Sequence, residues 1–243
     1  HRLVAASVIH ADLALPGHVD EHELAFAVGM TAAHHACVAA VDVEHAADFK
    51  GHALELYASR ANVTNSLIAN AQGNCVKVVG GNVAFTHCTI ANFYVFEQRD
   101  VALALHNSYE SEPMPLYGAS FRNCIITGSK DDELMGYFTT YGDTIPNSIN
   151  YYFENSLINT IESDDSCFVN VVYDKVDVAP FAKEHFRKID NEVFDYDFHI
   201  TDVSVARGMA SDTFIDQLPY DIDGVVREQG SVDAGCYQYV GGE

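Results

Sequence analysis

The chain has 243 residues, of which 48% are hydrophobic, so it is long and apolar enough to bury a sizeable core. It carries 13 Lys and Arg residues against 35 Asp and Glu residues, a formal net charge of -22. A surface this acidic repels phosphate backbones and excludes a nucleic-acid-binding protein, and the sequence contains no run of about 18 apolar residues that would predict a transmembrane helix.

The first 60 residues are the least regular part of the sequence. They contain eight of the twelve histidines and no asparagine. The composition of residues 24–41 suits a helix, and the alternative is an eroded repeat with an inserted loop. Because the chain begins at His1 inside an apparent repeat, we expect a mature or truncated product, with room upstream for an export signal or lipid anchor.

One six-residue pattern recurs through the middle of the chain: an apolar residue, any residue, Asn or a similar residue, Ser or Cys, any residue, and Ile. Its four clear copies begin at intervals of 22, 36 and 32 residues. They are Val63–Ile68, Phe85–Ile90, Phe121–Ile126 and Phe153–Ile158, and a weaker copy is Val4–Ile9. An interval of 22 residues suits one coil of a parallel β-helix, and the longer intervals suit a coil with a loop insertion.

Short apolar runs precede these hexads, as one strand of a coil precedes the next. They are residues 53–57, 75–79 and 101–105. A β-sandwich also uses short strands, but it does not predict the same hexad at coil-length intervals. The pattern therefore predicts an all-β fold, a right-handed parallel β-helix with loop insertions.

The hexad positions predict how the core is packed. A single coil cannot bury its inner face, so equivalent positions of neighbouring coils should lie over one another. Asn at the third position suits a bend, and this position holds Asn65, His87, Asn123 and Asn155. Ser or Cys at the fourth position predicts a tightly packed interior site. We therefore expect buried free thiols, not disulfides or zinc ligands.

The last 50 residues carry a second set of motifs. They are Asp197-Phe198-His199-Ile200, Ser204-Val205-Ala206-Arg207-Gly208, Asp221-Ile222-Asp223-Gly224-Val225-Val226-Arg227 and Asp233-Ala234-Gly235-Cys236-Tyr237. In order and spacing this tail resembles the end of exported right-handed β-helix repeat proteins, especially those of gut and oral Bacteroidetes. Those chains close with D-F-H-L and S-x-A-x-G, then D-x-D-G-x-x-R, then D-x-G-A-Y. Val205 stands where Pro is usual, and Cys236 where Ala is usual.

The resemblance implies a pectate-lyase-like solenoid at the extracellular or outer-membrane surface, often a lipoprotein found with glycan-uptake systems. Some relatives are polysaccharide lyases or glycosidases and many have no known activity, so the fold does not fix the function. The end of a β-helix exposes unpaired strand groups that must be covered. We therefore expect coils over residues 1–178 and a C-terminal capping segment of the same domain over residues 179–243.

Two carboxylates in the tail, Asp221 and Asp223, allow two interpretations. Alternating carboxylates can bind Ca²⁺, although the full calcium loop of about 12 residues is missing. The alternative is an Asp-rich structural turn, in which Arg227 pairs with one of the carboxylates.

Residues for cleaving a polysaccharide can be named, although no complete catalytic signature is present. Hydrolases of this fold use clustered carboxylates, which points to Asp131 and Asp132, with a solvated loop as the alternative. Lyases need a base and a group that neutralises the uronate carboxylate. Lys77, Arg99 and His106 would line one outer face for this purpose, with lone surface charges as the alternative. The acidic surface disfavours a polyanionic sugar unless bound Ca²⁺ inverts the local field.

Tyrosines gather in and around the longest insertions between hexads. They are Tyr109, Tyr117, Tyr137, Tyr141 and Tyr151. Exposed aromatic rings stack on the apolar C–H faces of sugars, and loops on a rigid scaffold often carry function. These residues predict a glycan-binding groove, and the alternative is that their rings pack the loops onto the coils.

The sequence favours a non-catalytic surface protein that binds glycan or acts as a scaffold for other surface-assembly proteins. The alternative is a polysaccharide lyase or glycoside hydrolase that acts on an outer face of the β-helix. A basic residue beside bound Ca²⁺ in a groove would favour the enzyme, and scattered charges on flat faces would favour the binding protein.

Overall fold

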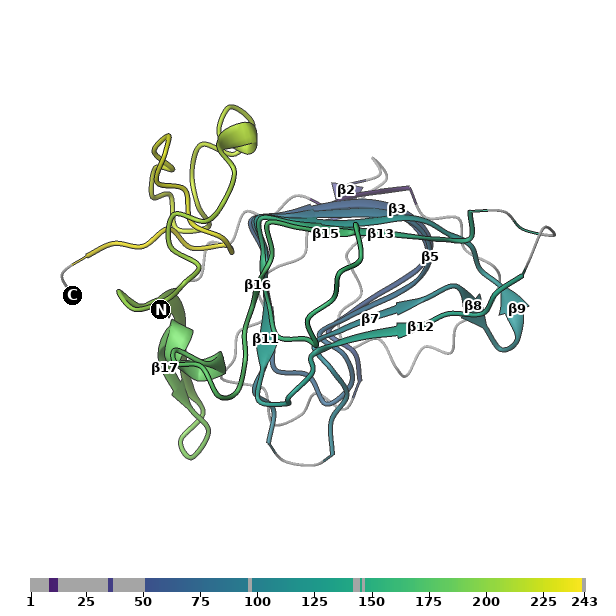
Figure 1. Ribbon diagram of the computed structural model, residues 1–243, viewed down its shortest axis with the longest axis horizontal. Helices are drawn as coiled ribbons and strands as arrows, with labels where there is room; N and C mark the ends of the chain where they lie inside the picture. The colour runs from purple at the N-terminus through teal and green to yellow at the C-terminus, as the bar shows by residue number, and fades with distance from the viewer. Residues whose placement is uncertain are drawn as a thin grey trace.

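The computed structural model describes residues 9–12, 35–36, 51–95, 98–141, 145 and 147–241. Within these residues the regular secondary structure is almost entirely β, in two large sheets and two hairpins. The larger sheet is curled like half a barrel, and the second sheet lies across its open side (Figure 1).

The larger sheet, sheet A, follows the order β15-β13-β10-β5-β3-β1-β2, with β7 joined to β5 and β12 joined to β7. Its strands are β1 (Ile9–Asp12), β2 (His35–Ala36), β3 (Leu54–Thr64), β5 (Val76–Thr86), β7 (Leu103–His106), β10 (Leu116–Arg122), β12 (Leu134–Tyr137), β13 (Ile149–Glu154) and β15 (Phe168–Val169). Neighbouring strands of sheet A are parallel from β3 to β15 and also in the branch through β7 and β12. By contrast, β1 runs antiparallel to both β2 and β3.

The smaller sheet, sheet B, is parallel throughout and follows the order β16-β14-β11-β6-β4. Its strands are β4 (Leu67–Ala69), β6 (Thr89–Asn92), β11 (Ile125–Gly128), β14 (Leu157–Ile158) and β16 (Val172–Tyr173). A small hairpin of β8 (Ser108–Tyr109) and β9 (Glu112–Pro113) follows β7.

A bend in the middle of β3 and β5 curls sheet A. It lies at Ala58, with a φ of 43°, and at Gly80 and Gly81, with φ values of 68° and 91°. A Cβ atom at Gly81 would lie 2.3 Å from the carbonyl oxygen of Ser59, so this corner requires glycine. Before the bend β5 pairs with β7, which in turn pairs with β12. After the bend β5 pairs with β10, which in turn pairs with β13.

The predicted stacking of the hexads is confirmed. Their first residues, Val63, Phe85, Phe121 and Phe153, pair in register, and Phe168 continues the column. Successive phenyl rings stack with centroids 4.9, 5.1 and 5.0 Å apart. The last residues, Ile68, Ile90, Ile126 and Ile158, form a second column in sheet B.

The predicted bends and buried thiols are confirmed as well. Asn65, His87, Asn123 and Asn155 all adopt the left-handed conformation, with φ values of 47°, 53°, 55° and 48°. The cysteines of the described residues are free thiols: Cys75, Cys88, Cys124 and Cys236 are buried, and Cys167 is half-buried. Cys37 lies outside the described residues.

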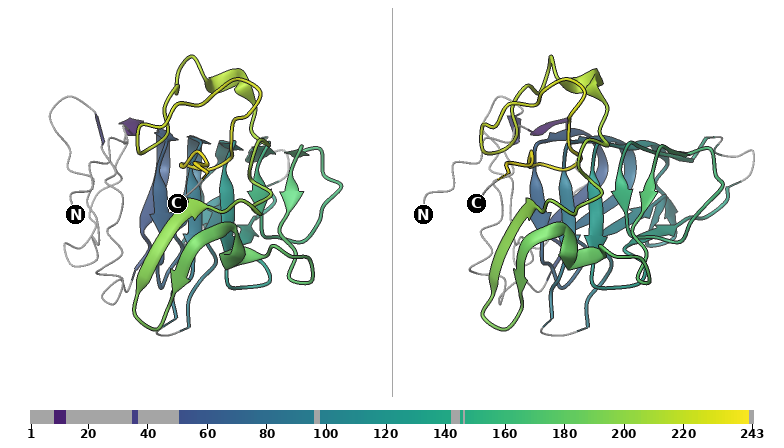
Figure 2. Two further views of the ribbon diagram at one scale, coloured as in Figure 1. Left: turned by 90° about the vertical axis from the view of Figure 1, so that its left-hand side faces the viewer. Right: turned by 60° about the vertical axis from the view of Figure 1, so that its left-hand side comes forward.

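The C-terminal segment lies along the side of the stack, not over its end as predicted. It contains the hairpin of β17 (Phe186–Asp190) and β18 (Asp195–Ile200) and the short turns η3 (Ala182–His185) and η4 (Asp212–Phe214). Figure 2 shows this segment in front of the strands of sheet B. The reason is that the outer face of sheet B is apolar, and burial of that face stabilises the fold. The outer face of sheet B and the C-terminal segment together form one hydrophobic cluster, which includes Leu67, Phe93, Ile125, Leu157, Phe186, Phe198 and Cys236.

The asparagines at the bends also hold this segment in place. The Asn123 amide donates to the carbonyl of Ser211 and accepts from its N–H, both at 2.9 Å. The Asn65 amide donates to the carbonyl of Tyr220 at 2.8 Å. Arg227 donates to the Asn65 side chain at 2.8 Å and to the carbonyl of Tyr220. The Asp221 carboxylate attracts Arg227 electrostatically but does not form the predicted direct pair with it.

Two predictions near the N-terminus fall mostly outside the described residues. Of residues 24–41, only His35–Ala36 is described, and it forms strand β2 instead of a helix. Of the weaker hexad copy, only Ile9 is described. Ile9 begins β1, and because β1 is antiparallel to β3 it does not continue the parallel stack.

Candidate functional site

One side of sheet A carries exposed aromatic and charged side chains. Before the bend, alternate residues of β3, β5, β7 and β12 point into the core, among them Leu54, Leu56, Val76, Val78, Leu103 and Leu105. The residues between them point outward and lie in two rows across the strands. One row is Glu55, Lys77, Ala104 and Met135, and the other is Tyr57, Val79, His106 and Tyr137.

We call the exposed group made by Glu55, Tyr57, Lys77, His106, Tyr109 and Tyr137 the aromatic face. The Tyr57 and Tyr109 rings meet edge to face with centroids 5.1 Å apart. The His106 ring stacks on Tyr137 at 4.5 Å, with 15° between the planes. Tyr109 and Tyr137 remain 44% and 51% exposed, so both rings offer apolar surface to a ligand.

A compact polar group lies beside these rings. The Lys77 ammonium is 2.6 Å from the Oε1 atom of Glu55, and the Tyr57 hydroxyl donates to the same oxygen at 2.6 Å. The Lys77 nitrogen also lies 5.6 Å from the centroid of the Tyr57 ring. Lys77 and His106, which the sequence analysis named together, lie near one another on the neighbouring strands β5 and β7.

The protonation states of this group follow from its contacts. Burial alone would raise the pKa of Glu55, but the hydrogen bonds from Lys77 and Tyr57 hold it below its usual value. Burial and the Glu55 carboxylate raise the pKa of Tyr57 far above its usual value. Burial, and after it the positive charge of Lys77, lower the pKa of His106. At neutral pH Glu55 is ionised, Tyr57 is protonated and His106 is neutral.

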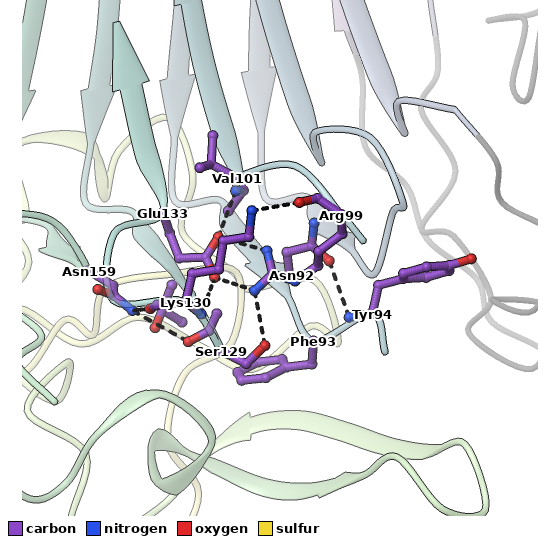
Figure 3. Close-up of polar contacts among 12 residues, drawn as sticks. Asn92, Phe93, Tyr94, Arg99, Val101, Ser129, Lys130, Glu133 and Asn159 are labelled. Atoms are coloured by element: carbon purple, nitrogen blue, oxygen red, sulfur yellow. Dashed lines mark hydrogen bonds and ion pairs between the residues drawn. The ribbon is translucent and has the colours of Figure 1, made fainter. Parts of the chain in front are cut away.

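Arg99 is not on this face, contrary to the sequence prediction. Its side chain is 5% exposed and pairs with Glu133, whose side chain is 0% exposed (Figure 3). Arg99 Nη1 lies 3.0 Å from Glu133 Oε2, and Nη2 donates to Oε1 and to Ser129. The backbone N–H groups of Ala102 and Lys130 donate to the same carboxylate, each at 2.8 Å. This ion pair links the segment before β7 to the segment before β12, the strand that pairs with β7, and its role is structural.

The acidic run that contains Asp131 and Asp132 is thus only partly solvated. Asp131 is exposed, and Asp132 accepts a hydrogen bond from the N–H of Leu134 in its own loop at 3.1 Å. Glu133, the third acidic residue, is buried. These contacts explain how the loop is held, and they do not form the paired acid and base of a hydrolase.

The remaining tyrosines divide between exposure and packing. Tyr117 is 62% exposed on β10, on the other side of the bend. Tyr151 packs against the core, with its ring stacked on Phe138 at 5.6 Å, so the packing alternative holds for it. Tyr141 is half-buried, and its hydroxyl has no hydrogen-bond partner among the described residues.

Asp221 and Asp223 form a structural turn. Asp221 Oδ1 accepts from the N–H groups of Asp223 and Val225 at 2.9 and 2.8 Å, and its Oδ2 accepts from the N–H of Gln238 at 2.8 Å. Asp223 pairs with His199 at 2.9 Å. Within the described residues no group of three His, Cys, Asp or Glu side chains could hold a metal ion. These contacts support the structural interpretation of the turn over the Ca²⁺ interpretation.

The contact of His199 with Asp197 and Asp223 makes the tail sensitive to pH. The hydrogen bond to Asp197 is the main cause that raises the pKa of His199 above its ordinary value of 6.5. Burial alone would raise the pKa of Asp197, but its bonds to His199 lower it below 3.8. A histidine whose pKa is raised by folding stabilises the fold at pH values below its pKa in the unfolded chain. This contribution is lost as the pH rises through its pKa in the folded chain. A lowered aspartate pKa stabilises the fold above 3.8, and this contribution is lost at lower pH.

We therefore expect the stabilisation by His199 to be greatest between pH 3.8 and 6.5 and to decline by pH 8.5. The loss should be roughly 1 kcal/mol or less, because the groups are partly exposed. Urea unfolding at pH 6 and pH 8.5 measures it. In His199→Gln the difference between the two pH values should shrink, and an unchanged difference would show that another group is responsible.

A separate hollow of about 520 Å³ lies where η3 meets the stack. It is lined by residues that include Phe93, Ser129, Phe181, Lys183 and Asn191. None of the site residues predicted from the sequence lines it. The aromatic face, which gathers Lys77, His106, Tyr109 and Tyr137, is therefore the better candidate.

Comparisons with protein-family models, with curated proteins and with solved structures find no match to this chain. In the part of the chain that the structure describes, no helix is long and apolar enough to cross a membrane.

The sequence prediction missed two residues of the aromatic face, Glu55 and Tyr57. Both lie in the apolar run 53–57, where they alternate with the buried Leu54 and Leu56. The same alternation that placed Lys77 on an outer face would have found them.

Proposed function

We propose that this chain is an exported right-handed parallel β-helix protein of the bacterial cell surface, and that its aromatic face binds glycan without cleaving it. The in-register hexads and the parallel pairing of both sheets support the β-helix. The tail motifs support the likeness to exported Bacteroidetes proteins. The proposal includes what that likeness implies, a lipid anchor and partner proteins that handle glycans.

The observation that carries the proposal is the pairing of exposed rings with fixed polar groups. Tyr109 and Tyr137 present apolar ring surface, on which the C–H faces of a sugar can stack. Lys77, Glu55 and His106 lie beside them and supply donors and acceptors for sugar hydroxyls. This combination of flat apolar contact and directed hydrogen bonds is what a sugar ring requires.

The charges of the face favour binding over cleavage. A glycoside hydrolase needs one protonated and one ionised carboxyl group, and the lowered pKa of Glu55 makes it unsuited to be the acid. A lyase needs a cation free to neutralise a uronate, whereas Lys77 is paired with Glu55 and Arg99 with Glu133. Glu55, Lys77 and Arg99 therefore supply neither the protonated carboxyl group of a hydrolase nor the free cation of a lyase.

Tyr137→Ala tests the proposal. We expect glycan binding to weaken roughly five- to tenfold, because a stacked ring contributes about 1 kcal/mol. A glycan-array screen with and without Ca²⁺ identifies the ligand, and calorimetry on the best probe measures the change. The loss should not depend on Ca²⁺.

Tyr117→Ala is the matched control, because Tyr117 is also exposed, at 62% against 51% for Tyr137, but lies beyond the bend. It should leave binding unchanged, and an equal loss in both variants would place the site elsewhere. New reducing or unsaturated ends in the glycan after incubation would contradict the non-catalytic part of the proposal.

A further inference from the structure

The positive charge of the aromatic face is already compensated. Lys77 Nζ lies 2.6 Å from Glu55 Oε1 and 3.4 Å from the Tyr57 hydroxyl oxygen. Both side chains are partly covered, with Lys77 19% and Glu55 33% exposed. A sugar on the face therefore meets an ion pair and not a free ammonium group.

His52 does not compete with Glu55 for the lysine. Its Nδ1 accepts a hydrogen bond from the N–H of Asn74 at 2.8 Å, so in the neutral ring Nε2 carries the proton. A protonated Nε2 cannot accept from Lys77, although the two nitrogens are 3.4 Å apart. The lysine hydrogens are therefore directed to Glu55 and to the Tyr57 hydroxyl.

The other groups around Lys77 add no positive charge at neutral pH. The neighbouring strand β7 contributes Ala104 beside Lys77, and neutral His106 in the next row. Glu110, on the turn between β8 and β9, is close enough to Tyr57 to raise the pKa of that hydroxyl. Glu112 adds a further negative charge in β9. The field over the face is therefore neutral to negative.

We infer that Glu55 determines the ligand class of the aromatic face: by holding Lys77 in an ion pair, it makes the face accept uncharged sugars and reject acidic ones. The inference rests on the proposed glycan binding. An acidic sugar would bring its carboxylate next to the Glu55 and Glu110 carboxylates without gaining an unpaired cation. An uncharged sugar avoids this repulsion, and its hydroxyls can donate to Glu55 and accept from Lys77.

Glu55→Gln tests the inference, because it keeps the shape and the acceptor oxygen but removes the charge that pairs with Lys77. The probes are neutral oligosaccharides and their counterparts of equal length in which uronic acids replace the hexoses. We expect the wild type to bind the neutral probe more tightly. In Glu55→Gln the affinity for the acidic probe should rise roughly five- to tenfold, and this gain should shrink at high salt.

Two matched variants separate the lysine from a general charge effect. Glu112→Gln removes one negative charge from β9 and leaves the Lys77 pair intact, so it should give little gain. Lys77→Met combined with Glu55→Gln should cancel the gain, because the unpaired cation is gone. An equal gain in Glu112→Gln, or a gain that persists in the double variant, would overturn the inference.

The failures of the two proposals are distinguishable. If the wild type binds neither neutral nor acidic glycans, the proposed function fails, and the inference fails with it. If it binds acidic glycans as tightly as neutral ones, or if Glu55→Gln gains no affinity for them, glycan binding stands and the selecting role of Glu55 is refuted.

Discussion

Glu133→Gln is expected to lower the free energy of unfolding by about 3–5 kcal/mol. The variant keeps the shape of the side chain but leaves the Arg99 guanidinium without a counter-charge in a site where the two side chains are 5% and 0% exposed. The Glu133 carboxylate also accepts the N–H groups of Ala102 and Lys130, which would compete for a single remaining oxygen. Urea unfolding followed by circular dichroism measures the change.

Glu154→Gln is the matched control for this prediction. Glu154 also pairs with an arginine of the preceding hexad, Arg122, at 3.2 Å, but these side chains are 31% and 37% exposed. Because water screens such a pair, its loss should cost less than about 1 kcal/mol. Equal effects of the two substitutions would show that burial does not control the contribution of Glu133.

Phe121→Ala is expected to destabilise the fold by a similar amount, about 3–5 kcal/mol. The Phe121 ring is fully buried between those of Phe85 and Phe153, at centroid distances of 4.9 and 5.1 Å. Removing it opens a cavity in the middle of the column, and the rigid strands on both sides cannot close it. The midpoint and slope of urea unfolding report the loss.

Phe168→Ala provides the comparison within the same column. Phe168 is the last ring in the column, stacks on Phe153 at 5.0 Å, and is only half-buried. Its truncation should cost clearly less, because water can fill the space that the ring leaves. If Phe168→Ala were as damaging as Phe121→Ala, the column would not be the main source of the stabilisation.

The register of the strands was predictable because the hexad reports it directly. The same side-chain types recur at the same positions, so Phe85, Phe121 and Phe153 had to meet once the hexads paired in parallel. Four of the six residues of the aromatic face were named from the sequence, and the position of one of them was predictable for a related reason. Lys77 lies in a run whose alternation fixes which residues point outward.

The burial of Glu133 was not predictable from its surroundings. Three acidic residues in a row resemble a solvated loop, and the residue that decides otherwise, Arg99, lies 34 positions earlier in the chain. The position of the tail was missed for a different reason. The fifth position of the hexad seemed free to vary, but it holds Leu67, Thr89, Ile125 and Leu157, a mostly apolar row on the outer face of sheet B. An apolar row on an outer face predicts a segment that covers it, and here the C-terminal segment does so.

The strands of sheet A shorten toward both ends of its main path, which bears on self-assembly. β3 and β5 have 11 residues each, whereas the outermost strands β15 and β2 have two. A long unpaired edge is a template onto which a second copy can add a strand, and a very short edge offers few backbone groups for this purpose. We therefore expect crowded copies of this chain to stay separate instead of polymerising end to end into fibres.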